Sequence, residues 1–163
     1  MRVFKEEQRF LQLWLIVLLA FSAIVPLTLT IREYLDKKIM LSNLIWTIVI
    51  IIIASSLIFF FKLKTRIDEK GIHYQFFPFH LKFKTFLWND IKNVDIRKYD
   101  AISEYGGWGL NKSFFNKKKG KAITVSGDTG IQIELNSNKK TLIGTLKENE
   151  IKRVLETYKH KIS

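Results

Sequence analysis

The side chains that could bind a metal ion or transfer a proton are those of three histidines, His73, His80 and His160. A metal site needs several His, Cys or carboxylate ligands at fitting spacings, and a catalytic histidine needs a nucleophile or a carboxylate beside it. No HExxH or similar pattern is present, and the chain has no cysteine. We therefore expect structural roles for the histidines, no metal site and no cofactor.

Motifs for phosphate transfer and for hydrolysis are also missing from the sequence. Neither a Walker A motif nor a GxSxG motif occurs. The segment Gly127-Asp128-Thr129-Gly130 leads into a strand-like run rather than a helix, so it predicts a hairpin turn. The acidic pairs Asp68 with Glu69 and Asp90 with Asp95 fit turns and helix caps. We therefore expect that the protein is not an enzyme.

The stretch from Ala101 to Gly120 is the main candidate for binding a lipid surface or a protein partner. It is predicted as a long loop, and loops of about 20 residues inside a compact domain are usually functional or disordered. Glycines surround its tryptophan, and a pair of phenylalanines precedes a basic run. The candidate contact residues are Trp108, Phe114, Phe115, Lys117, Lys118, Lys119 and Lys121.

Three interpretations of the basic run stay open. The lysines could bind anionic lipid head groups, which contributes about 1 kcal/mol per Lys near the surface, with Phe114 and Phe115 entering the interface. They could instead bind an acidic protein, or form a solvated turn. Trp108 could be exposed on the loop or packed in the core, and the packed position is preferred.

Two uncharged runs in the first third of the chain predict a membrane hairpin. The run from Phe10 to Ile31 has 22 residues and the run from Ile39 to Phe61 has 23. A helix of 22 residues is about 33 Å long, enough to cross a hydrocarbon core of about 30 Å. A cleaved signal peptide is the alternative for the first run, because Ala20-Phe21-Ser22 loosely resembles a cleavage site. The apolar stretch continues well past that site, so we expect the span to be retained.

The positive residues that flank these runs indicate how the hairpin is oriented. Three stand in the first nine residues, three in the connection from Arg32 to Lys38, and four in the nine residues after Phe61. Lys and Arg concentrate on the cytoplasmic side of membrane segments. We therefore predict a multi-pass protein of the cytoplasmic (inner) membrane, with both termini in the cytoplasm.

Residues 62–163 predict a separate domain that follows the hairpin of residues 1–61. They contain 21 Lys and Arg against 11 Asp and Glu, and short alternating segments with turn residues between them. This spacing predicts about seven antiparallel strands. The seven segments are 63–68, 72–77, 81–84, 94–97, 122–125, 131–135 and 141–145.

One amphipathic helix is predicted to close the chain. Thr145 and Glu148 fit a capping box, with Thr145 as the N-cap. An apolar stripe at helical spacing follows, formed by Ile151, Val154, Leu155 and Tyr158. No βαβ pattern occurs, so we predict an all-β domain, a partly open barrel or sandwich capped by a C-terminal α-helix.

Several local motifs in residues 62–160 occur in an order that is known from one group of proteins. They are Arg66-Ile67-Asp68-Glu69-Lys70-Gly71-Ile72, Leu87-Trp88-Asn89-Asp90-Ile91, Tyr105-Gly106-Gly107-Trp108-Gly109, Ser126-Gly127 with Gly130-Ile131, and Leu142-Ile143-Gly144-Thr145. With the two-span layout, they resemble bacterial membrane proteins that carry a pleckstrin-homology-like (PH-like) domain. The resemblance implies a fold and a membrane setting, but no reaction. In phosphoinositide-binding pleckstrin domains the basic head-group motif lies in the first hairpin, where this chain has Asp68 and Glu69.

These observations favour a non-enzymatic, membrane-anchored PH-like scaffold or interaction protein. Its expected partners are the lipid bilayer and either another protein or a second copy of itself. The alternative is a small membrane enzyme, or an accessory subunit of a transport or envelope-synthesis complex. The net charge of +12 alone does not predict nucleic-acid binding, because no recognised motif accompanies it.

Overall fold

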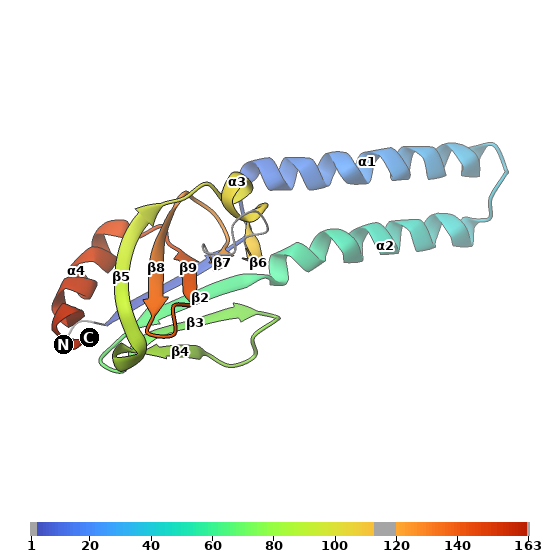
Figure 1. The fold of residues 1–163 in the computed structure, drawn as a ribbon. Coiled ribbons are helices and arrows are strands. Elements are labelled where there is room, and N and C mark those ends of the chain that lie inside the picture. The colour runs from blue at the N-terminus through green and yellow to red at the C-terminus, as the bar shows by residue number, and fades with distance from the viewer. Residues whose placement is uncertain (1–2, 113–119, 163) are drawn as a thin grey trace. The chain divides into compact units, whose positions relative to one another are not determined.

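The computed structural model describes residues 3–112 and 120–162, and the chain divides into two compact units (Figure 1). One unit consists of residues 10–61. The other joins the residues up to Arg9 to those from Lys62 onward. The boundary therefore differs from the predicted one, which places all of residues 1–61 in the hairpin.

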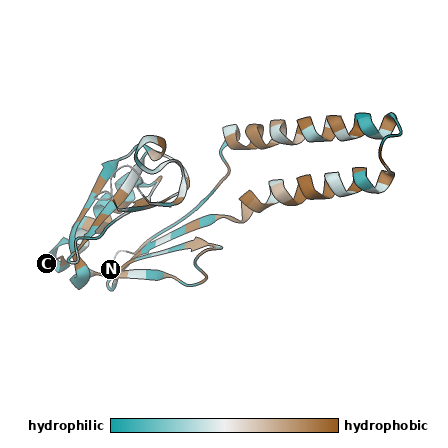
Figure 2. Ribbon diagram, turned by 45° about the vertical axis from the view of Figure 1, so that its right-hand side comes forward, coloured by the Kyte–Doolittle hydropathy of each residue, from teal (hydrophilic) through white to brown (hydrophobic). Residues whose placement is uncertain are grey.

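The helical unit contains α1 (Leu13–Leu35) and α2 (Leu41–Phe60). Both ribbons are mostly coloured as hydrophobic in Figure 2, and neither helix has a buried residue. Each helix is long and apolar enough to cross a membrane, as the two uncharged runs predict. Helix α1 continues past the predicted end at Ile31 to Leu35, because a charged residue such as Arg32 can meet water without ending a helix.

The β unit contains a strand that precedes both helices. β1 (Phe4–Arg9) pairs antiparallel with β2 (Lys62–Ile67), the first strand after them. β3 (Gly71–Phe77) and β4 (Lys84–Leu87) complete a four-stranded sheet in the order β1-β2-β3-β4, here called sheet A. The apolar pattern does not predict β1, because two of its three buried side chains are the polar Glu6 and Gln8.

Sheet B has five strands in the order β5-β8-β9-β7-β6, and its only parallel pair within the described residues is β7 with β9. The described residues thus form nine strands rather than about seven, and the two sheets do not close into a barrel. The strands of sheet B are β5 (Ile91–Lys98), β6 (Gly109–Lys112), β7 (Lys121–Thr124), β8 (Thr129–Leu135) and β9 (Lys140–Gly144).

Two parts of the strand prediction are wrong. The segment 101–120, predicted as a loop, contains the short helix α3 (Ala101–Tyr105) and strand β6. Strand β4 begins at Lys84 rather than Leu81, because the Gln75 amide donates to the Leu81 carbonyl at 2.8 Å and holds that residue in the loop.

The C-terminal helix α4 (Glu148–Tyr158) lies beside β5 (Figure 1). The predicted apolar stripe is confirmed, since its four members are buried. Tyr158 stacks on the buried Trp88 with ring centroids 5.4 Å apart. Trp88 belongs to the 3₁₀ turn η1 (Trp88–Asp90), and its indole N–H donates to the Asp68 carbonyl at 2.9 Å. The helix and the turn thereby close one end of the core. A second 3₁₀ turn, η3 (Lys159–Lys161), follows α4.

The predicted capping box is wrong. The N-cap of α4 is Lys147, which makes no side-chain cap bond. The Thr145 hydroxyl instead donates to Glu6 Oε2 at 2.7 Å and accepts from the Lys147 N–H at 3.0 Å. A partner from β1, distant in sequence, thus replaces the local bond to Glu148 that the pattern predicts.

Candidate functional site

The outer face of sheet A, turned away from the core, is positively charged. In β1 and β2 every second residue is buried, and the residues between them are exposed or half-buried. The cations on this face are Lys5, Arg9, Lys62, Lys64 and Arg66. The register places Lys5 opposite Arg66, and Arg9 opposite Lys62. Like charges directly opposite one another destabilise a sheet, so a bound anion would relieve this arrangement.

Two carboxylates, Glu7 and Asp68, lie among these cations. Glu7 Oε1 accepts from Arg9 Nε at 2.9 Å and Nη2 at 2.6 Å, and Glu7 Oε2 lies 3.4 Å from Lys64 Nζ. The bond from Arg9 is the main cause that lowers the pKa of Glu7. Asp68 Oδ2 lies 3.0 Å from Arg66 Nη2. With five cations against two carboxylates, the face keeps a net positive charge at neutral pH.

A hollow of about 370 Å³ opens on this face. Its lining consists of the three cations Lys5, Lys64 and Arg66, the two carboxylates Glu6 and Glu7, and Thr65 and Phe83. The volume falls within the range of small-ligand pockets, about 300–1,000 Å³. Ammonium and guanidinium groups are the usual protein ligands of phosphate. The arrangement, here called the basic hollow, can therefore hold a phosphate-bearing group.

His73 lies opposite Arg66 in the register and links three parts of sheet A. Its Nδ1 is 2.7 Å from Thr85 Oγ1 and its Nε2 is 2.9 Å from Asp68 Oδ1. Burial acts to raise the pKa of Asp68, but the bonds from His73 and from the Lys70 N–H outweigh it, so the pKa is lowered. A hydroxyl, an imidazole and an ionised carboxylate in this order can activate an oxygen nucleophile.

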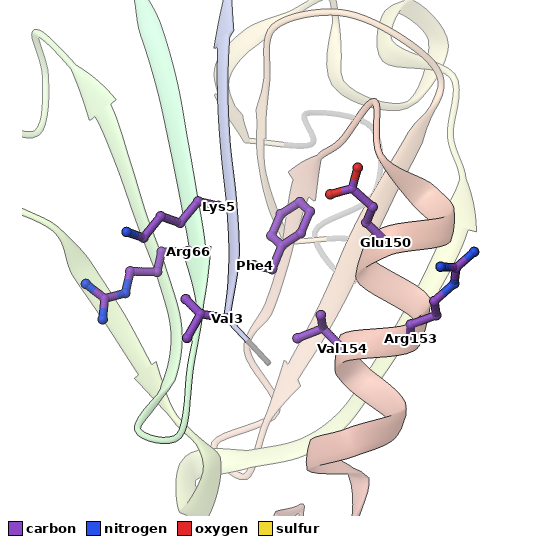
Figure 3. A pocket seen from close by; sticks show the side chains of 7 residues that line it. All are labelled: Val3, Phe4, Lys5, Arg66, Glu150, Arg153 and Val154. Carbon is purple, nitrogen blue, oxygen red and sulfur yellow. The ribbon is translucent and has the colours of Figure 1, made fainter. Parts of the chain in front are cut away.

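A larger hollow of about 660 Å³ lies between β1 and α4 (Figure 3). Figure 3 shows the Lys5 and Arg66 side chains pointing away from α4, and the Arg153 side chain pointing away from β1. The three cations therefore do not converge on a single anion. Phe4 and Val154 line the space between the two elements, so this hollow is a partly apolar groove.

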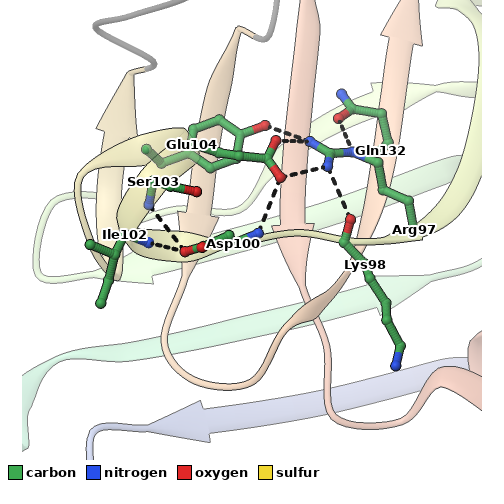
Figure 4. Close-up of polar contacts among 8 residues, drawn as sticks. Arg97, Lys98, Asp100, Ile102, Ser103, Glu104 and Gln132 are labelled. Atoms are coloured by element: carbon green, nitrogen blue, oxygen red, sulfur yellow. Dashed lines mark hydrogen bonds and ion pairs between the residues drawn. The ribbon is translucent and has the colours of Figure 1, made fainter.

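Arg97 lies at the centre of a polar cluster between β5, β8 and α3 (Figure 4). Its Nε donates to Gln132 Oε1 at 3.0 Å, and Nη1 donates to the Lys98 carbonyl at 3.1 Å and to Glu104 Oε1 at 3.3 Å. Nη2 donates to Glu104 Oε2 at 3.1 Å and to the Tyr105 hydroxyl at 2.9 Å. All five N–H groups of the guanidinium thus have acceptors, so the cluster positions α3 rather than a ligand.

Local hydrogen bonds explain why residues 101–105 form a helix. Asp100 is the N-cap, and its Oδ1 accepts from the backbone N–H groups of Ile102 and Ser103 at 2.9 and 3.0 Å. Gly106 ends the helix at φ +78°, the left-handed conformation that glycine adopts most easily. The Asp and the Gly are a recognisable cap pair, a signal that predicts this short helix when both are considered together.

Of the contact residues predicted from the sequence, the structure describes Trp108 and Lys121. Trp108 is partly buried against a cluster that includes Tyr99 and Tyr105, and its indole N–H donates to the Gly127 carbonyl at 3.3 Å. Lys121, exposed at the start of β7, lies near His80. Burial, then the charges of Lys84 and Lys121, lower the pKa of His80. The other predicted contacts lie outside the described residues and stay predictions, namely Phe114, Phe115, Lys117, Lys118 and Lys119.

None of the cations on the outer face of sheet A is among the contact residues predicted from the sequence. Lys64 and Arg66 alternate with apolar or small residues within the predicted strand 63–68, and Lys62 directly precedes it. This alternation is the signal that could have located half of the face. The other half, from β1, becomes visible only when β1 is paired with β2.

Comparisons with models of protein families, with curated proteins and with solved structures found no match. Within residues 3–112 and 120–162, no group of three or more His, Asp or Glu side chains is arranged to hold a metal ion. The candidate site therefore depends on the geometry of sheet A alone.

Proposed function

We propose that this chain is a non-enzymatic, membrane-anchored interaction protein whose β unit binds the anionic lipid surface next to its own helices. The observation that carries the proposal is the outer face of sheet A, where five cations and the basic hollow lie on β1 and β2. Lys62 follows Phe61, the residue directly after α2, so the first cation of β2 is covalently close to a helix long enough to span a bilayer.

In this proposal α1 and α2 cross the cytoplasmic membrane, and both termini lie in the cytoplasm. The excess of Lys and Arg before α1 and after α2 supports this orientation. Anionic lipids of the cytoplasmic leaflet then face the β unit, and each cation near the surface contributes about 1 kcal/mol. A protease-sensitive tag fused after Ser163 should be cut only in inverted membrane vesicles. Cleavage in right-side-out vesicles would contradict the orientation.

The β unit is proposed to be a PH-like domain. The support is its two mainly antiparallel sheets, followed by a C-terminal helix whose buried stripe packs on them. β1 is an addition to the seven-strand layout that the resemblance implies.

The lipid contact can be tested in the full chain, because an introduced cysteine is the only thiol present. A fluorophore on Lys5→Cys should be quenched by nitroxide-labelled lipid head groups in nanodiscs containing phosphatidylglycerol. Quenching should weaken at high salt and in the added Lys64→Gln/Arg66→Gln background, since both changes reduce the attraction to anionic lipid.

The matched control for charge is Lys139→Gln/Lys152→Gln, which removes two exposed cations elsewhere in the β unit. It should leave the quenching unchanged. Quenching that is equal in phosphatidylcholine alone, or that is insensitive to salt, would count against lipid binding by this face.

One observation favours the enzyme alternative, namely the order of Thr85, His73 and Asp68. In an acyl transfer, His73 would accept the proton of the Thr85 hydroxyl while the Thr85 oxygen attacks an ester carbonyl. His73 would then give that proton to the leaving alcohol as the ester C–O bond breaks. A fluorophosphonate probe that labels the wild type, but neither Thr85→Val nor His73→Gln, would favour this alternative. The absence of labelling would support the non-enzymatic proposal. A protein partner captured in stoichiometric amount in mild detergent would instead favour a scaffold.

A further inference from the structure

The loop between β3 and β4, residues 78–83, exposes three large apolar side chains. Phe79 is 62% exposed, Leu81 77% and Phe83 48%. Lys82 stands between the last two, and Lys84 follows them. Single exposed apolar residues are common on protein surfaces, whereas a cluster on one loop marks a site that contacts a membrane or another protein.

This loop is held in one shape by contacts to β3. The His80 N–H donates to the Phe76 carbonyl at 2.8 Å, and the Gln75 amide donates to the Leu81 carbonyl at 2.8 Å. The rings of Phe79 and Phe76 are stacked, with centroids 5.9 Å apart and an interplanar angle of 4°. The apolar side chains therefore stay exposed on an ordered backbone, and binding would cost little further conformational entropy.

The loop begins at the end of sheet A that is connected to the helices. Phe77, the last residue of β3, is paired with Lys62, which follows the residue after α2. Neighbouring strands are about 4.8 Å apart, so the loop starts close to the point where the chain leaves α2 and begins β2. The β2–β3 turn with Lys70 lies at the opposite end of these strands, about 17 Å away at 3.3 Å per residue.

We infer that the β3–β4 loop is a membrane-inserting segment. Phe79, Leu81 and Phe83 enter the interface of an anionic phospholipid bilayer, while Lys82 and Lys84 bind lipid phosphates. Phe83 also lines the basic hollow, so the apolar and the charged contacts form one continuous surface. Apolar side chains flanked by lysines match the boundary between acyl chains and head groups. The inference rests on the proposed function, because it requires α2 to span the bilayer.

The test places an environment-sensitive fluorophore on Leu81→Cys in the full chain, reconstituted in nanodiscs containing phosphatidylglycerol. We expect a blue shift of the emission and a loss of intensity with lipids that carry a nitroxide high on the acyl chain. Phe79→Cys is a second labelling position and should give the same result. The matched control, Lys70→Cys, lies in the exposed turn at the other end of sheet A and should emit as in water.

Water-like emission from both loop positions, equal to that of Lys70→Cys, would overturn the insertion. The result is separable from the proposed function, which is measured by head-group quenching at Lys5→Cys. Head-group quenching with a water-exposed loop would keep lipid binding and refute insertion. Acyl-chain nitroxides could quench the loop equally in nanodiscs with phosphatidylglycerol and in nanodiscs of phosphatidylcholine alone. That result would support insertion but refute its preference for anionic lipid.

Discussion

The carboxylate of Glu6 accepts a hydrogen bond from the hydroxyl of Thr145 at 2.7 Å, although the two residues lie near opposite ends of the chain. The other oxygen of Glu6 accepts from the Leu146 N–H at 2.9 Å. Two residues along β1, the Gln8 amide donates to the Gly144 carbonyl at 2.9 Å. A strand that precedes both helices therefore holds the end of β9 and the segment that enters α4.

We predict that Glu6→Ala destabilises the β unit. Glu6 is only 8% exposed, and its removal leaves the Thr145 hydroxyl and the Leu146 N–H without their acceptor. Leaving the buried Thr145 hydroxyl unpaired costs about 1–3 kcal/mol, and the part-buried Leu146 N–H adds less because water can reach it. The measurement is the thermal unfolding midpoint of the full chain in detergent, followed by near-UV circular dichroism. Glu7→Ala is the control, because an exposed ion pair contributes only about 0–1 kcal/mol. Equal effects of the two variants would contradict the prediction.

Two glycines with positive φ should respond differently to alanine. Gly71 has φ +154°, and a Cβ there would lie 2.0 Å from the Phe86 carbonyl oxygen of β4. Gly106 has φ +78°, and a Cβ there would meet nothing within 4 Å. Gly106→Ala should cost only the backbone strain of about 1–2 kcal/mol. Gly71→Ala should cost clearly more, because overpacking adds about 1–3 kcal/mol. Chemical unfolding in detergent measures both, and similar losses would rule out the steric explanation.

Arg97→Lys should loosen α3 even though it keeps the charge. A lysine presents one ammonium and cannot replace the five directed bonds that the guanidinium makes to Gln132, Lys98, Glu104 and Tyr105. A lost hydrogen bond to a charged group costs about 1.5–3 kcal/mol. Hydrogen exchange of the α3 amides should rise in Arg97→Lys and stay at the wild-type level in Lys98→Met, whose side chain is exposed. Unchanged exchange in Arg97→Lys would show that the cluster does not position α3.

The β unit should become less stable as the pH falls, because the folded state disfavours the protonated form of His80. Burial and the charges of Lys84 and Lys121 lower the pKa of His80 in the folded state below the ordinary value of 6.5. The folded protein then binds fewer protons than the unfolded chain, so stability is lost as the pH falls through 6.5 towards the folded-state pKa. The unfolding midpoint should decrease between about pH 7.5 and about pH 5.5. His80→Gln should reduce this decrease, whereas His160→Gln, an exposed control, should not. If the unfolding midpoint decreased by the same amount in His80→Gln, groups other than His80 would be its cause.

Several elements could be predicted because their signal is local. The helices α1 and α2 follow from uncharged runs longer than 20 residues, and α4 follows from the stripe that ends at Tyr158. Strand β8 follows from Ile131 and Ile133, which alternate with polar residues and are buried. In α4, and at Ile131 and Ile133 of β8, the buried side chains are apolar, so the period of the hydrophobic residues equals the period of the structure. The helices α1 and α2 follow instead from the length of their uncharged runs.

The elements that the sequence predicts wrongly are those in which polar contacts outweigh the apolar periodicity. Strand β1 is hidden because its buried positions include Glu6 and Gln8, whose partners lie beyond both helices. The alternation of Leu81, Lys82 and Phe83 predicts a strand. These residues instead form the apolar loop, because Gln75 holds the Leu81 carbonyl. The capping box fails for a similar reason, since Thr145 bonds to Glu6.

By itself, the sequence determined that two apolar helices precede a basic, strand-rich region closed by an amphipathic helix. Length, charge-free runs and residue spacing are properties of a continuous segment, and they need no knowledge of its neighbours. Only the tertiary structure decided that Arg9 lies opposite Lys62 and that Lys5 lies opposite Arg66. β1 and β2 are separated in the sequence by both helices. Which strand edges pair depends on tertiary packing, and no single segment of the sequence encodes that packing. The basic outer face is formed by cations of both strands because of that pairing.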